Sequence, residues 1–110
     1  MPVALTEYKA ESENDAVKFS IDDIDSHRYL CFYGAGNAAD LSPTVSVYDA
    51  QDELVSQLTV EAGKLDGSKH QFVLNLPKLT GAVTIVFTGG SVDNAESVDG
   101  SYVFSDIMLY

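Results

Sequence analysis

The chain has no tryptophan, a single cysteine, three prolines and only six basic residues in 110. One cysteine, Cys31, excludes an internal disulfide. It lies in the apolar run 29–33, where a small side chain suits a packed strand, and we expect a buried, inert thiol. The start of the chain lacks the basic and apolar regions of a signal peptide, and no apolar run approaches membrane-spanning length. A cytoplasmic protein and a module of a larger secreted one both stay open. We expect the secreted module because the chain ends with its last strand.

Positive charge is scarce. Seventeen acidic residues face six basic ones, for a formal net charge of -11. Such a surface repels phosphate backbones and anionic lipid, so nucleic acid and membranes are not expected partners. Neutral polymers and divalent cations remain. The acidity alone is equally explained by solubility.

Helical periodicity is also missing, and short strands alternate with turn residues. Residues 16–21 alternate apolar and polar side chains, and Thr44 to Tyr48 with Leu54 to Val60 form the clearest hairpin. Further strands are expected at residues 3–10, 28–33, 71–76, 82–88 and 102–110. The sequence predicts one all-β domain over residues 1–110, an antiparallel β-sandwich (jelly roll) of about eight strands.

Two segments are ambiguous. Residues 10–17 form the only plausible helix, but Ser12, Asn14 and Asp15 favour caps and turns, so we expect no helix there. Residues 34–40, rich in glycine and alanine, are expected to be a loop.

The last strand carries an acidic residue, Asp106, between apolar neighbours. Burying an ionised carboxylate is costly unless a cation or several donors meet it. Asp106 is therefore expected either to face solvent or to belong to a site.

The segments Gly81 to Gly90 and Val103 to Ile107 resemble the closing half of carbohydrate-binding modules of the galactose-binding-like superfamily, above all families 6, 35 and 36. The resemblance implies a non-catalytic module that binds a plant or microbial polysaccharide, outside the cell, as part of a larger enzyme. It also implies a structural calcium ion, held by Glu11, Glu13 and Asp106. The other acidic clusters are interpreted as solvated turns.

Sugar binding uses aromatic rings against the flat face of a pyranose, with amides and carboxylates near the hydroxyls. Of six tyrosines, Tyr33 and Tyr102 flank loops, and Asn37 and Asn94 are the amides expected to accompany them. A packing role in the core is the alternative for both tyrosines.

No catalytic motif is recognised: there is no nucleophile elbow, phosphate-binding loop or zinc-protease helix. We therefore expect a protein that is not an enzyme. The rival hypothesis is a structural or interaction jelly roll, used in assembly or adhesion without binding sugar.

Overall fold

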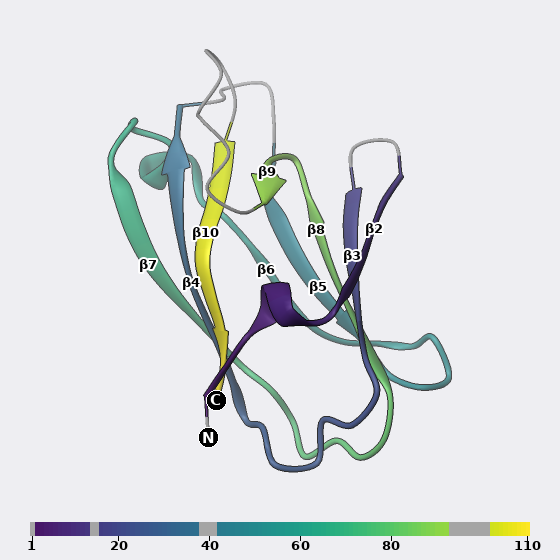
Figure 1. Cartoon of the computed structure of the whole chain (residues 1–110). Helices are drawn as coiled ribbons and strands as arrows, with labels where there is room; N and C mark the ends of the chain where they lie inside the picture. Colours follow the sequence, from purple (N-terminus) through teal and green to yellow (C-terminus); the bar gives the residue numbers. More distant parts are fainter. Residues whose placement is uncertain (1, 14–15, 38–41, 93–101) are drawn as a thin grey trace.

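The computed structural model describes residues 2–13, 16–37, 42–92 and 102–110, and these form two β-sheets packed face to face (Figure 1). In spatial order, sheet A contains β1 (Val3–Ala4), β10 (Tyr102–Leu109), β4 (Tyr29–Gly36) and β7 (Lys69–Asn75), with β9 (Ser91–Val92) beside β10. Sheet B contains β2 (Lys9–Glu13), β3 (Ala16–Ile21), β8 (Val83–Thr88), β5 (Thr44–Tyr48) and β6 (Leu54–Thr59). Neighbouring strands are antiparallel, except that β9 runs parallel to β10. The predicted antiparallel sandwich is confirmed.

Two short 3₁₀ turns, η1 (Leu5–Glu7) and η2 (Ala62–Lys64), complete the described elements. In that part of the chain no helix has the length and apolarity needed to cross a bilayer. The described residues contain ten strands rather than about eight, because β1 and β2 replace the expected first strand and β9 is additional. Leu5 is fully buried in the core, and around it the chain passes from sheet A to sheet B.

The core between the sheets is centred on phenylalanines from both. Phe87 of sheet B packs edge-to-face against Phe32 and Phe104 of sheet A, with ring centroids 6.1 and 5.0 Å apart. Phe19 and Ile21, on the inner face of β3, are both buried, as their alternation predicts. Apolar burial of this kind is the main force that holds the two sheets together.

Strand β10 contains a bulge, which decides which side chains face outward. Its pairing with β4 shifts between Ser105 and Met108, and Asp106 has a left-handed backbone conformation with φ of 49°. An extra residue reverses the alternation of a strand. Tyr102 and Phe104 face inward before the bulge, and after it the inward residues are Ile107 and Leu109. Tyr110 consequently falls on the outer side of sheet A.

The segment 34–36, expected to be a loop, is the end of strand β4. Gly34 pairs with Phe104 on one side and with His70 on the other. A Cβ built on Gly34 would lie 2.1 Å from the hydroxyl oxygen of Tyr102. Glycine is needed here for the close approach of a side chain rather than for a turn.

Candidate functional site

The outer surface of sheet A carries an exposed group of apolar and aromatic side chains. Residues alternate along β4, so Leu30 and Phe32 enter the core while Tyr29, Cys31 and Tyr33 face outward. Opposite Cys31 lie Val73 on β7 and Met108 on β10. We call this surface the tyrosine face and define it by six residues: Tyr29, Cys31, Tyr33, Val73, Met108 and Tyr110.

Tyr29 and Tyr110 are direct neighbours on this face. The amide of Tyr110 donates to the carbonyl of Tyr29 at 2.8 Å, and the amide of Tyr29 donates back at 3.0 Å. Residues paired in this way project their side chains from the same side of a sheet. The two tyrosines remain 50% and 46% exposed, so both rings are accessible from solvent.

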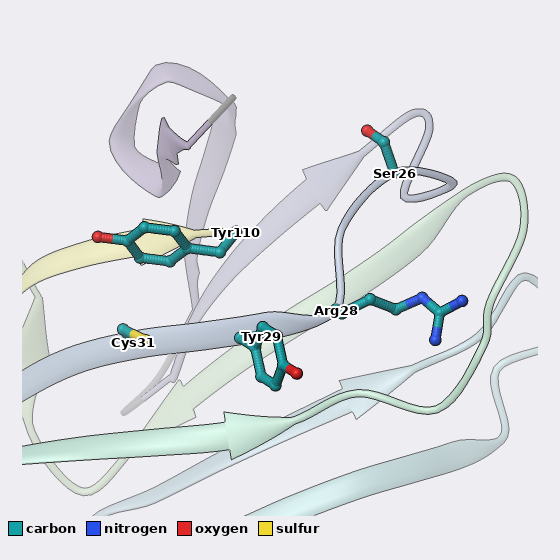
Figure 2. Close-up of a pocket in the computed structure, with 5 residues that line it drawn as sticks. All are labelled: Ser26, Arg28, Tyr29, Cys31 and Tyr110. Atoms are coloured by element: carbon teal, nitrogen blue, oxygen red, sulfur yellow. The ribbon is translucent and has the colours of Figure 1, made fainter.

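An open pocket of about 500 Å³ adjoins the pair, lined by Ser26, Arg28, Tyr29, Cys31 and Tyr110. This volume lies within the range of small-ligand sites. Figure 2 shows Tyr110 projecting from β10, and Tyr29 and Cys31 projecting from β4. Arg28 extends beyond Tyr29, on the side toward which the Tyr29 hydroxyl points (Figure 2). The pocket therefore combines aromatic surface with one cation and two kinds of hydroxyl.

Tyr33, predicted to contact sugar, lies on the same face but farther along β4. The ammonium of Lys69 lies 4.9 Å from the centre of its ring, in a cation–π contact. The same ammonium is 3.4 Å from a carboxylate oxygen of Asp106. Asp106, the acidic residue between apolar neighbours in the last strand, is thus exposed and paired with a lysine.

The other three predicted sugar contacts differ in their positions. Tyr102 is fully buried on the inner face of sheet A and packs edge-to-face on Phe104, with ring centroids 5.2 Å apart. Its predicted role in ligand contact is corrected to packing, the alternative considered above. Asn37 is exposed just beyond the end of β4, and Asn94 lies outside the described residues.

The Tyr102 hydroxyl is buried without a hydrogen-bond partner among the described residues. Desolvation by burial, reinforced by the nearby charge of Asp66, raises the pKa of Tyr102 to about 12. Asp66 itself pairs with the imidazole of His70 at 2.8 Å. That hydrogen bond, together with the amide of Ser68, lowers the pKa of the Asp66 carboxyl. Tyr102 is thus a neutral core residue at physiological pH.

The three carboxylates predicted to hold calcium are not brought together. Glu11 and Glu13 lie on β2 of sheet B, and Asp106 lies on β10 of sheet A with Lys69 as its partner. Over residues 2–13, 16–37, 42–92 and 102–110, no group of three or more acidic, histidine or cysteine side chains has a geometry for a metal ion. This ligand set does not fit, whereas calcium binding itself stays a prediction from the resemblance.

Sheet B carries a smaller pocket on its outer face, with a volume of about 290 Å³. Its lining is more polar and includes one tyrosine: Lys18, Tyr48, Asp52, Thr84 and Val86. Because only one aromatic ring contributes, it offers less stacking surface than the tyrosine face.

Sequence reasoning counted Tyr29 and Tyr110 among the six candidate tyrosines but singled out Tyr33 and Tyr102 instead. The strict alternation of Tyr29, Cys31 and Tyr33 was a usable signal for one outward face. No comparable signal in the sequence pointed to Tyr110, because the bulge at Asp106 was not recognised. An unbroken alternation from Tyr102 would place the Tyr110 side chain on the inner face of the sheet.

No protein-family model matches the chain, and no curated protein matches it. Solved structures do share its fold. One is a family 6 carbohydrate-binding module from Clostridium stercorarium in complex with cellobiose, with 11% identity, a TM-score of 0.54 and coverage of 96% of this chain and 92% of that one. Another is a family 43 arabinoxylan arabinofuranohydrolase from Bacillus subtilis, with 16% identity, a TM-score of 0.51 and coverage of 88% of this chain.

A third is the K3 adhesin domain of Lys-gingipain from Porphyromonas gingivalis, with 16% identity, a TM-score of 0.50 and coverage of 89% of this chain. The chain spans 20% of the hydrolase and 65% of the adhesin domain. At these identities the comparisons establish the fold alone: a β-sandwich shared, among others, with a family 6 carbohydrate-binding module.

Proposed function

We propose that this domain is a non-catalytic carbohydrate-binding module that holds a plant or microbial polysaccharide against the tyrosine face. The observation that carries the proposal is the pair of adjacent, half-exposed rings of Tyr29 and Tyr110 beside an open pocket. A pyranose packs its C–H face on such rings while its hydroxyls need donors and acceptors. Arg28 and Ser26, at the margin of the pocket, supply them.

The tyrosine face has room for an oligosaccharide. Tyr33 lies four residues beyond Tyr29, about 13 Å along the strand at roughly 3.3 Å per residue. Lys69 and Asp106 stand beside Tyr33 as donor and acceptor. We therefore include Tyr33, and Asn37 beyond it, as the far end of the same platform.

Binding without catalysis agrees with the lining of the pocket. Glycoside hydrolysis generally needs two carboxyl groups that flank the scissile bond. Among the residues that the structure describes, the five that line the pocket include no carboxylate side chain. We further propose that the domain works outside the cell as one part of a larger secreted protein, because the fold recurs as a small fraction of a hydrolase.

The test is affinity electrophoresis in gels that contain individual polysaccharides, preceded by a glycan array. We expect retardation by at least one polysaccharide, with a dissociation constant of about 10 µM to 1 mM. Tyr29→Ala or Tyr110→Ala should weaken binding about tenfold, the equivalent of about 1.4 kcal/mol. Tyr48→Ala, the same substitution at the pocket of sheet B, is the matched control and should bind as the wild type does.

An array without any bound glycan would contradict the proposal. Wild-type binding by both tyrosine variants would contradict the assigned site.

The rival function, a structural or interaction module, is favoured by one observation: Val73, exposed to 52%, extends the apolar surface of the tyrosine face. Solution mass distinguishes the two, since self-association abolished by Tyr29→Ala would support the rival.

A further inference from the structure

Arg28 stands out among the cations of this acidic chain. It is the sole arginine, and it lines the pocket that also holds the two exposed tyrosines. Lys9 and Lys69 are paired with carboxylates, whereas Arg28, like the remaining lysines, forms no ion pair among the described residues. Of these unpaired cations, Arg28 is the one that lines the pocket with the two exposed tyrosines. In a chain of net charge -11, a guanidinium placed beside two exposed aromatic rings is the feature of this pocket that could bind an anion.

The acids nearest to Arg28 in sequence are used for other contacts. Asp23 accepts the backbone amide of Asp25 at 2.9 Å, and Asp25 accepts the backbone amide of Gly81 at 2.8 Å. These bonds hold the turn before β4 in place and direct two carboxylates to the backbone. Asp22, the third acid of the turn, is exposed and makes no ion pair with Arg28 among the described residues.

The main chain of Arg28 is fixed on both sides. Its amide donates to the carbonyl of Tyr110, and its carbonyl accepts the amide of Leu76 at 2.9 Å. The base of the side chain is therefore held beside the Tyr29–Tyr110 pair. The side chain is exposed, and its guanidinium makes no hydrogen bond to the residues that the structure describes. A guanidinium in this state binds an oxyanion with paired hydrogen bonds.

We propose, building on the proposed function, that the pocket selects a glycan whose neutral chain carries an isolated anionic group, a carboxylate or a sulfate. The sugar ring packs on Tyr29 and Tyr110, and Arg28 binds the anion. A densely charged polyanion is excluded because its further charges would meet the acidic turn 22–25 and the net negative surface. At physiological salt, charges are screened over about 8 Å. The single arginine therefore attracts mainly an anionic group that contacts it directly.

The test uses oligosaccharides in matched sets: a neutral chain, the same chain with one uronic acid, the same chain with one sulfate, and a polyuronate. Binding is measured by calorimetry with wild type, Arg28→Gln, Arg28→Lys and Lys64→Gln. Lys64 is an exposed cation on η2, outside the pocket lining, and its variant loses the same charge. Melting temperatures confirm that all four proteins are folded.

We expect one substituted chain to bind at least tenfold more tightly than its neutral counterpart, and the preferred substituent identifies the anion. This ratio should fall to about one in Arg28→Gln, be intermediate in Arg28→Lys and be unchanged in Lys64→Gln. Equal binding of neutral and substituted chains, unaffected by Arg28→Gln, would overturn this inference and leave the proposed function standing. Tighter binding of the polyuronate would also overturn it. Absence of binding to every chain, or a dimer dispersed by Tyr29→Ala, would overturn both.

Discussion

Gly34 and Tyr102 fit together so closely that the first has no room for a side chain. A Cβ on Gly34 would lie 2.1 Å from the Tyr102 hydroxyl oxygen and 2.6 Å from two of its ring carbons. Tyr102 is fully buried against Phe104 and has little freedom to move. The contact locks the ends of β4 and β10 together and holds the Tyr102 ring in the core.

Gly34→Ala is accordingly expected to destabilise the domain by about 1–3 kcal/mol, the usual cost of overpacking a core. Thermal or urea unfolding followed by circular dichroism measures it. Gly63→Ala is the matched control, since a Cβ there meets nothing within 4 Å, and it should unfold like the wild type. Equal stability of the two variants would contradict this account of Gly34.

Tyr102→Phe is expected to stabilise the domain at neutral pH by about 1 kcal/mol, because it removes a buried hydroxyl that has no partner among the described residues. The measurement is the melting temperature of both proteins. A lower melting temperature for the variant would indicate that the hydroxyl has a partner after all.

The alkaline stability of the domain follows from the same residue. The pKa of Tyr102 is raised from 10.0 to about 12 in the folded state. The neutral form is thus favoured by folding, so its contribution is complete below pH 10 and is lost as the pH rises toward 12. The wild-type melting temperature should fall more steeply over this interval than that of Tyr102→Phe. If the melting temperatures of the two proteins fall in parallel, the pKa of Tyr102 is the same in the folded and the unfolded state.

Asp106 is expected to matter for its backbone conformation rather than for a metal. Asp106→Asn should change stability by less than about 0.5 kcal/mol, because asparagine tolerates a positive φ and the lost ion pair is exposed. Asp106→Val should cost about 1–2 kcal/mol, since a β-branched residue is strained there. Melting with calcium and with EDTA completes the test. A calcium response that disappears in Asp106→Asn would restore this residue as a ligand.

Cys31 offers an independent report on the pocket. It is partly buried, lines the pocket and is the sole thiol, so alkylation by iodoacetamide reports on one position. A saturating oligosaccharide from the array should slow the labelling severalfold, while a sugar that does not bind should leave it unchanged. Unaltered labelling under saturation would place the sugar elsewhere on the domain.

The sequence was sufficient for the sandwich and for most of its strands. Residues 16–21 and 44–48 are strands with the predicted bounds, and the hairpin of β5 and β6 is present. These properties depend on local alternation and turn residues, which neighbouring positions encode. The tertiary structure was needed for the segment 34–36, because Gly34 makes room for the ring of Tyr102, which lies 68 positions away along the chain.

The tertiary structure likewise decided which tyrosines lie on the surface. Composition and charge argued against polyanionic partners. The six tyrosines were visible as candidates, but the face of the sheet on which each one lies was not. Tyr102 is buried and Tyr110 is exposed because a single bulge at Asp106 reverses the alternation between them. A one-residue change in register moves every following side chain to the other face of a sheet, and such a change depends on pairing with a distant strand.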